Sequence, residues 1–204
     1  MTIREVVARI RGDLSQVSAD STFTDRHLFN AFWTASRLIL QRNADEGIPI
    51  NGKSFTSTVV NTEEVDKFEG TCVPLNCTVC RAKIRKPLMG KKRGFIYHFV
   101  GSVDYATSFS VVTPYEFSIK TSIKGAGNFA YIDGDYIYFS KCLPCVRITA
   151  LFEEYGGDTD TGGCSVLDNE VVIDDFLIEA AIRMAKENLV RNPYDHSANK
   201  NANQ

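Results

Sequence analysis

The chain has 204 residues, of which 44% are hydrophobic and 24% charged, a composition that excludes a wholly disordered or fibrous protein. Its formal net charge of −2 excludes the overall basic excess of a dedicated duplex-DNA binder, so any contact with nucleic acid would be local. No apolar run approaches the roughly 18 residues of a membrane span, and the first residues lack a secretory leader. We therefore expect a soluble protein, made in a cytoplasm, with no membrane partner.

Two amphipathic helices are predicted at the start of the chain. Thr2 and Glu5 have the spacing of a capping box, and apolar residues at helical intervals follow them. A second apolar stripe runs through residues 24–42. Gly47 and Pro49 are expected to end this second helix, because glycine favours the left-handed cap and proline cannot continue a helix.

The middle of the chain, residues 54–152, consists of short β-branched and aromatic runs divided by Gly, Pro, Asn and Asp, which is typical of strands and turns. Its clearest signal is a hairpin over residues 129–139, where Asp133-Gly134 is expected to supply the positive φ angles of a two-residue turn. The other predicted strands are residues 55–60, 71–77, 81–85, 95–100, 109–112, 116–121 and 145–152.

The end of the chain holds a loop, a helix and a polar tail. The glycine-rich segment 155–164 is predicted to be a loop before a last helix that begins at Asp174 and ends at Pro193. Ile173 and Ile178 have the spacing of a hydrophobic staple. The tail after Pro193 has almost no apolar residues, so we expect it to be disordered in the isolated chain.

These elements predict an α+β fold, in which a helical layer from the N-terminal and C-terminal helices packs with a central antiparallel β region. The predicted domains are residues 1–47 and 173–192 for the helical part, residues 48–172 for the β region with its loops, and residues 193–204 for the extended polar tail.

Six cysteines include two Cys-x-x-Cys units. Two such units can place four thiolates around zinc, but 61 residues lie between Cys80 and Cys142, and neither unit has the glycine that follows a zinc knuckle. We interpret the cysteines as partly buried free thiols, and no cofactor is expected. A thioredoxin-like redox pair and a zinc site remain as alternatives. The zinc ligands would be Cys77, Cys80, Cys142 and Cys145.

Enzymatic activity is not predicted. The 3 histidines belong to no HExxH motif, and no serine lies in a nucleophile elbow. Gly125-Ala-Gly127-Asn128 lacks the helix and the lysine of a phosphate-binding loop, so a turn before the hairpin explains it better. The sequence therefore favours a structural or binding protein.

A basic run is the most informative surface feature. Residues 81–93, RAKIRKPLMGKKR, contain seven cations and no carboxylate. Such a run is either a solvated edge strand and loop, or a surface that faces DNA phosphates or an acidic neighbour. Residues 63–69 and 153–160 are candidate acidic complements on an adjacent subunit. The residues predicted to face DNA or a partner are Arg81, Lys83, Arg85, Lys86, Lys91, Lys92 and Arg93.

Three segments carry a resemblance to a known family. They are TDRHLFNAFWTASRLILQRNADEG in the second helix, FAYIDGDYIYFSKCLPCVRITALFEEY through the hairpin and the next strand, and DDFLIEAAIRMAKENLVRNPYDHSANKNANQ at the end of the chain. The order and residue pattern of these segments resemble those of the head-to-tail connector adaptors of short-tailed phages. This tail-tubular or ring-protein group includes relatives in crAss-like phages.

The resemblance implies a structural virion protein of the neck or tail, an adaptor ring that joins the portal to the tail and surrounds the DNA channel. The implied partners are other copies of the chain in a ring of twelve, the portal protein, downstream tail or ring proteins, and packaged DNA through non-specific contact. The implied docking residues of the tail are Pro193, Tyr194, Asp195 and His196. The alternative function is a zinc-stabilised nucleic-acid-binding module that uses the two Cys-x-x-Cys units.

Overall fold

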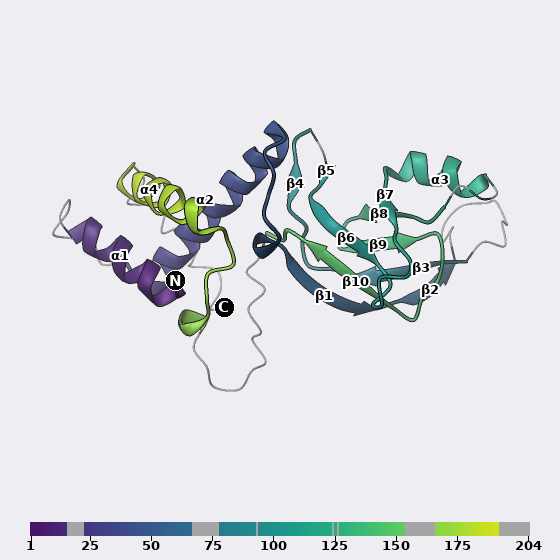
Figure 1. The fold of residues 1–204 in the computed structure, drawn as a ribbon, viewed down its shortest axis with the longest axis horizontal. Coiled ribbons are helices and arrows are strands. Elements are labelled where there is room, and N and C mark those ends of the chain that lie inside the picture. The colour runs from purple at the N-terminus through teal and green to yellow at the C-terminus, as the bar shows by residue number, and fades with distance from the viewer. Residues whose placement is uncertain are drawn as a thin grey trace, which may run out of the picture. The chain divides into compact units, whose positions relative to one another are not determined.

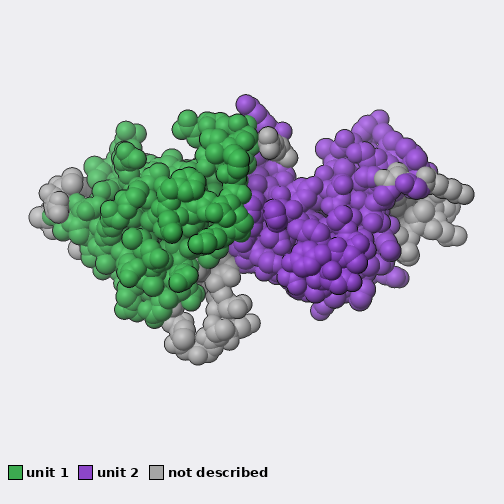
Figure 2. Space-filling view, in the orientation of Figure 1, with its two compact units in different colours: residues 1–54, 155–204 green, residues 55–154 purple. Residues whose placement is uncertain are grey.

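The computed structural model describes residues 1–15, 23–66, 78–92, 94–123, 125, 127–153 and 166–191. The chain forms two compact units, coloured separately in Figure 2. Unit 1 comprises residues 1–54 and 155–204, and unit 2 comprises residues 55–154. Long helices gather in unit 1 and strands in unit 2, so the predicted α+β class is confirmed.

Three helices build unit 1 (Figure 1): α1 (Ile3–Ser15), α2 (Asp25–Glu46) and α4 (Asp175–Arg191). Each has one apolar stripe, and the stripes are buried where α2 packs against both α1 and α4. The predicted packing of the N-terminal helices with the C-terminal helix is therefore confirmed. Their buried side chains include Ile3, Val6, Ile10, Leu28, Phe32, Leu40, Ile178, Ile182 and Leu189.

The predicted start of α1 and the predicted end of α2 at Gly47 are also confirmed. The backbone N–H of Thr2 donates to the Glu5 carboxylate at 2.8 Å, and the Glu5 N–H donates to the Thr2 hydroxyl at 3.3 Å. Thr24 caps α2, which continues past residue 42 as far as Glu46. Gly47 then ends the helix in the left-handed region, with φ of 77°.

The start of the chain is joined to the segment before α4. This segment contains the short helix η2 (Val166–Asp168). The Ile3 N–H donates to the Asn169 carbonyl at 2.9 Å, and the Val171 N–H donates to the Met1 carbonyl at 3.0 Å. An ion pair of 2.6 Å between Lys186 and Asp13 adds a link between α4 and α1.

Unit 2 consists of two main sheets and a small hairpin. The three-stranded sheet has the order β1 (Thr56–Asn61), β10 (Cys145–Ala150), β6 (Tyr97–Gly101). The five-stranded sheet has the order β2 (Glu63–Asp66), β3 (Thr78–Lys83), β9 (Tyr136–Phe139), β8 (Phe129–Asp133), β7 (Ser110–Val111). The hairpin pairs β4 (Met89–Gly90) with β5 (Gly94–Phe95). The pairs are antiparallel except β7 with β8, which are parallel.

The core of unit 2 lies between the two main sheets. Alternate residues of β10, including Val146 and Ile148, are fully buried in one cluster with Ile137 and Phe139 of β9. This alternation leaves the other side chains of each strand on the outer faces of the sandwich. Unit 2 therefore has two outer faces, one on each sheet.

Helix α3 (Pro114–Ser122) covers the outer face of the five-stranded sheet, with Phe117 buried against it and the Tyr131 ring 4.7 Å away. The prediction of a strand at residues 116–121 is wrong. Thr113 is an N-cap, Pro114 opens the helix, and Glu116 completes a capping box, so local capping outweighs the β-branched composition.

The predicted hairpin over residues 129–139 is confirmed, but its turn is displaced by one residue. Asp133 still pairs with Tyr136, so the two turn residues are Gly134 and Asp135. Only Gly134 has a positive φ, 57°, as a type II′ turn requires at its first position.

Most other predicted strands overlap observed ones, namely those at residues 55–60, 81–85, 95–100, 109–112 and 145–152. Strands β2 and β4 were not predicted. The strand predicted at 71–77, the loop at 155–164 and the tail from 193 lie outside the described residues.

Candidate interaction surfaces

The basic run is divided among three places in unit 2. Arg81 and Lys83 lie on β3, and Arg85 and Lys86 lie on the segment that follows it. Residues 91–92 form the tip of the β4–β5 hairpin. Arg93 lies outside the described residues. The run is therefore not one continuous basic patch.

Arg81 is paired within the chain. Its Nε lies 2.6 Å from a Glu63 carboxylate oxygen, across the β2–β3 register that places these residues opposite each other. Its guanidinium also lies 4.5 Å from the centre of the Tyr136 ring. Hydrogen bonds to Glu63 and then to Tyr138 raise the pKa of Arg81, so its charge is used to hold β2 on β3.

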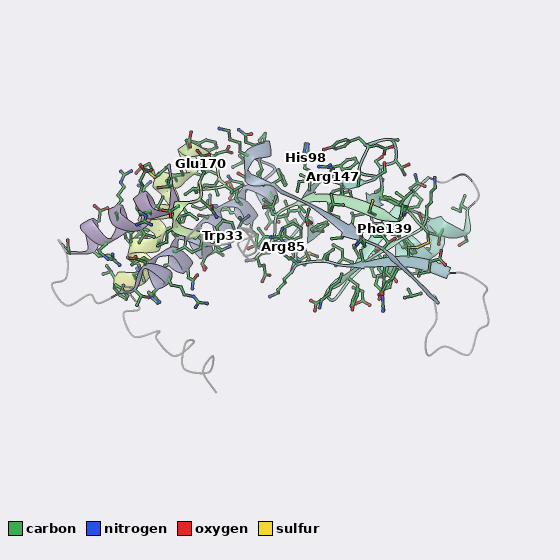
Figure 3. All side chains as sticks on the ribbon, turned by 90° about the horizontal axis from the view of Figure 1, so that it is seen from below. Trp33, Arg85, His98, Phe139, Arg147 and Glu170 are labelled. Atoms are coloured by element: carbon green, nitrogen blue, oxygen red, sulfur yellow. A yellow bond between two sulfur atoms is a disulfide. The ribbon has the colours of Figure 1, made fainter. Side chains whose placement is uncertain are left out.

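The next two cations also have partners in the chain. Lys86 lies 2.6 Å from the Glu153 carboxylate, and the Arg85 guanidinium, labelled in Figure 3, lies 4.8 Å from the Phe152 ring centre. We expected the acidic segments that contain Glu63 and Glu153 to complement an adjacent subunit. Within the chain each of these two carboxylates pairs with a cation of the basic run, and a contact of the acidic segments with a neighbouring subunit stays a prediction.

Lys83, Lys91 and Lys92 are exposed. The two hairpin lysines precede Gly94, whose φ of 68° lets the chain turn back into β5. A hairpin tip with adjacent ammonium groups can approach a polyanion without disturbing the core. These three lysines are therefore the part of the run best placed to meet DNA or a partner.

The cysteines differ from the expectation of free thiols. Cys80 and Cys142 form a disulfide that connects β3 to the segment after β9, while Cys145 is free. Cys77 lies outside the described residues. The Glu64 carboxylate and the two bonded sulfurs lie within 4.8 Å of one another, but a disulfide sulfur carries no thiolate charge with which to hold a metal.

His98 and Asp104 are residue types that occur in catalytic sites, but their contacts here are those of structural residues. His98 is exposed beside the Phe55 ring at 5.6 Å. Asp104 accepts a hydrogen bond of 3.1 Å from the Ala106 N–H. Hydrogen bonds from the Ser102 side chain and then from that N–H lower the pKa of Asp104, which thus serves to close a turn.

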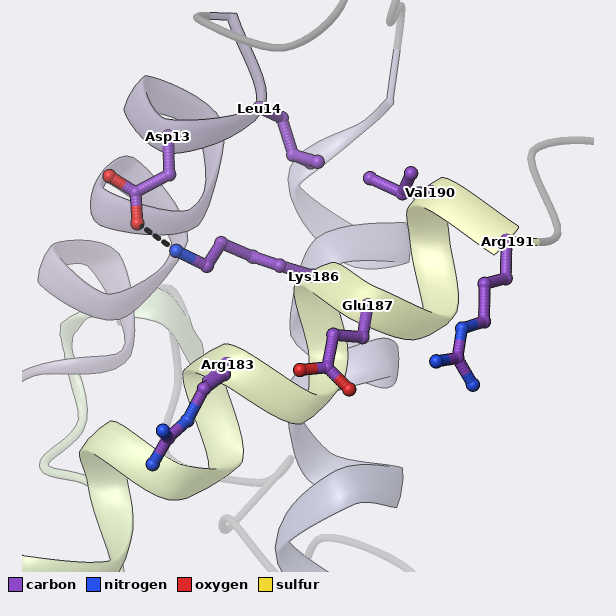
Figure 4. A pocket seen from close by; sticks show the side chains of 7 residues that line it. All are labelled: Asp13, Leu14, Arg183, Lys186, Glu187, Val190 and Arg191. Carbon is purple, nitrogen blue, oxygen red and sulfur yellow. Dashed lines mark hydrogen bonds and ion pairs between the residues drawn. The ribbon is translucent and has the colours of Figure 1, made fainter.

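Two hollows were missed by sequence reasoning, because each combines residues from distant segments. In unit 1, a pocket of about 260 Å³ lies between the ends of α1 and α4 (Figure 4), with Leu14 and Val190 among charged side chains that include the Asp13–Lys186 pair. In unit 2, a groove of about 320 Å³ lies beside the start of α3, with Met89 at one border.

The predicted docking residues Pro193, Tyr194, Asp195 and His196 lie outside the described residues. No helix in the described part of the chain combines the length and apolar character needed to cross a membrane.

Comparison with known families gives one finding. A protein-family model described as phage tail ring protein 2 matches residues 5–204. The match covers both units and nearly the whole chain, and it agrees with the resemblance carried by the three sequence segments. A comparison with curated proteins finds no match.

Proposed function

We propose that this chain, which belongs to the phage tail ring protein 2 family, forms an adaptor ring. The ring joins the portal to the tail and surrounds the DNA channel. Family membership makes the chain a structural component of the virion tail, assembled in a ring with other tail proteins, and not an enzyme. The position of the ring in the neck, its contact with the portal and its passage for DNA are the proposed part.

The family match over residues 5–204 is the observation that carries the proposal. The two separately cored units support it, because an adaptor needs different surfaces for different neighbours. The exposed Lys83 and the adjacent exposed pair Lys91 and Lys92 at the hairpin tip support proximity to DNA, since exposed cations attract phosphates without regard to sequence.

The finer assembly follows from the same resemblance. We propose twelve copies in the ring, with the helical unit against the portal. The tail residues Pro193, Tyr194, Asp195 and His196 would dock on the portal or on a neighbouring copy. The zinc-stabilised alternative is less well supported, because the Cys80–Cys142 disulfide uses two of the four sulfurs that it requires.

A cryo-electron microscopy reconstruction of the virion neck tests this function. We expect a ring of twelve copies between the portal and the next tail component, with DNA or an open channel on its axis. A ring of this chain located at the far end of the tail, or one that does not contact the portal, would refute the adaptor role while leaving family membership intact.

A further inference from the structure

Helix α3 presents an apolar ridge to solvent. Tyr115, Ile119 and Ile123 are exposed by 77%, 46% and 58%. Tyr115 and Ile119 are four residues apart, so they lie on one side of the helix, and Phe117, which α3 buries against the sheet, points the opposite way. Ile123 is the extended C-cap residue that directly follows the helix. We call these three residues the α3 ridge. Such a ridge is unusual on the surface of a monomer, because exposed apolar side chains seldom adjoin one another.

A second apolar surface lies on the three-stranded sheet. It consists of Val59, Phe99, Tyr105 and Arg147, which we call the sheet-face patch. Val59 is 50% exposed and lies opposite Arg147 in the β1–β10 register. The Tyr105 ring lies 4.9 Å from the Phe99 ring and 5.1 Å from the Arg147 guanidinium (Figure 3 labels Arg147).

The loop that carries Tyr105 is closed by hydrogen bonds and has a strained backbone. Tyr105 is 61% exposed and has a φ of 62°, an unfavourable conformation for a bulky residue. Two hydrogen bonds of 2.8 Å between Ser102 and Thr107 close the loop. At Gly101 a Cβ atom would lie 2.2 Å from the Thr107 carbonyl oxygen, so this approach requires glycine. Strain of this kind gathers at binding surfaces, and here it fixes an exposed aromatic ring in place.

The ridge and the patch lie on opposite sides of unit 2. Helix α3 covers the outer face of the five-stranded sheet, whereas the patch belongs to the outer face of the three-stranded sheet. A ring joins copies head to tail through two different surfaces. In a ring of many copies these surfaces face almost opposite ways, about 30° from antiparallel for twelve copies.

We propose that the α3 ridge of one copy docks on the sheet-face patch of the next copy. The proposal rests on the ring assembly of the proposed function, and it names the contact that closes the ring. Charge complementarity also favours a second copy of the chain as the partner of the patch. The exposed Glu116 carboxylate borders the ridge, while the patch contains Arg147. Arg147 is half-buried, and one terminal nitrogen of its guanidinium lies 3.5 Å from the Ser57 hydroxyl, so the part of the guanidinium that stays accessible on the sheet face is what a carboxylate of the docking copy would meet.

Single charges placed on either surface test the contact. Ile119→Asp and Val59→Lys are each expected to lower ring formation at least about tenfold, because each buries a charge in an apolar interface. Ser118→Asp is the matched control, since it adds the same charge to an exposed position of α3 that is not one of the three ridge residues. Rings are counted by electron microscopy and native mass spectrometry, and unchanged thermal unfolding shows that each variant is folded.

Mixing the two variants identifies the occupant. In an alternating ring, the α3 ridge that carries the new aspartate would meet the sheet-face patch that carries the new lysine, and every remaining contact would join unaltered surfaces. We therefore expect an equimolar mixture of Ile119→Asp and Val59→Lys chains to form rings that neither variant forms alone. If both variants fail and the mixture also fails, the two surfaces bind something other than each other, such as another tail protein, and the pairing is refuted.

The outcomes separate this inference from the proposed function. If chains with Ile119→Asp form rings as well as chains with Ser118→Asp do, the pairing is overturned. The proposed adaptor ring is then unaffected. A wild-type chain that forms no ring, alone or in the virion, counts against ring assembly itself and thus against both proposals.

Discussion

Cys80 and Cys142 are joined by a disulfide across 62 residues of sequence, with their Cα atoms 5.2 Å apart. The bond connects β3 to the end of the hairpin that pairs with it, so it closes a loop containing β4 through β9. A crosslink that closes so long a loop removes many conformations from the unfolded chain. It therefore stabilises unit 2, whose strands pair over long sequence distances.

Loss of this bond should destabilise unit 2. Replacing both Cys80 and Cys142 by serine is expected to lower the free energy of unfolding by up to about 4 kcal/mol, the loop-entropy value for a loop of this length. Urea unfolding of the oxidised wild-type chain and the double variant measures the difference. Reductant should lower the stability of the wild-type chain towards that of the variant and leave the variant unchanged.

Cys145→Ser is the matched control for this bond, because Cys145 is free and lies three residues after Cys142. It should have little effect, with or without reductant. Equal stability of the oxidised and reduced wild-type chains would show that the bond does not hold the sandwich together.

A buried charge in unit 1 gives a second prediction. Arg37 of α2 is only 5% exposed, its Nε and one terminal nitrogen lack partners, and its guanidinium lies 3.6 Å from the Trp33 ring centre. Arg37→Met keeps an unbranched side chain and removes the desolvated charge. We expect it to raise stability by about 1–2 kcal/mol near pH 7, since the lost cation–π contact offsets part of the gain.

The same residue has a pH signature. Burial lowers the pKa of Arg37 to about 9, so above that pH the unfolded chain binds more protons than the folded chain at this site. The wild-type chain therefore regains stability as pH rises through about 9 towards the ordinary arginine value. The difference in the free energy of unfolding between Arg37→Met and the wild-type chain should therefore decrease between about pH 8 and pH 10.5, measured by parallel unfolding experiments. A difference that stays constant with pH would contradict this prediction.

The cap of α3 gives a third prediction, which bears on the ridge that this helix carries. The Thr113 hydroxyl accepts a hydrogen bond from the Glu116 N–H at 3.3 Å. Thr113→Ala should therefore cost about 1 kcal/mol in urea unfolding at pH 7. Ser118→Ala is the control, and it should not lower stability, because Ser118 is exposed on the same helix and alanine favours helix.

Acid should weaken this cap. Hydrogen bonds from the Thr113 N–H and then from its hydroxyl, followed by the charge of Lys120, lower the pKa of Glu116. A lowered carboxyl pKa contributes stability above the ordinary glutamate value and loses it as pH falls through the folded value. The effect of Thr113→Ala should accordingly shrink in acid, and an effect that grew on acidification would contradict this assignment.

The helices of unit 1 could be predicted from sequence because their signals are local. Thr2 and Glu5 are three residues apart, the apolar stripes repeat within each helix, and Gly47 marks one end by its own conformational freedom. The hairpin turn at Gly134 is local in the same way, although whether Gly134 is paired in the turn with Asp133 before it or with Asp135 after it depends on the register of the two strands.

What sequence reasoning missed depends on competing or distant signals. Residues 116–121 alternate like a strand, and only the preceding Thr113-Pro114 step shows that a helix begins there. The α3 ridge was missed for the same reason. No local pattern joins Cys80 to Cys142, or Lys86 to Glu153, because each pair is formed by the folding of distant segments.

The hairpin tip gives the last prediction. Replacing Lys91, Lys92 and the following residue in sequence, Arg93, by glutamine should leave unfolding stability nearly unchanged, because Lys91 and Lys92 are exposed and exposed charges contribute little to it. If the tip faces DNA in the assembled ring, the variant should still form rings but retain packaged DNA less securely. The loss should be larger at high ionic strength, where the remaining cations are screened.

A second variant separates this local effect from a general loss of positive charge. Replacing the exposed residues Arg26, Arg183 and Arg191 of unit 1 by glutamine removes the same formal charge from another surface. DNA release from virions is then measured against salt for the wild type and both triple variants. A defect confined to the hairpin variant places the tip at the DNA channel, because equal losses of net charge would weaken long-range attraction equally. Weaker ring formation by the hairpin variant in high salt would instead place the tip against an acidic neighbouring protein, and normal rings with normal DNA retention would mean that the tip faces only solvent.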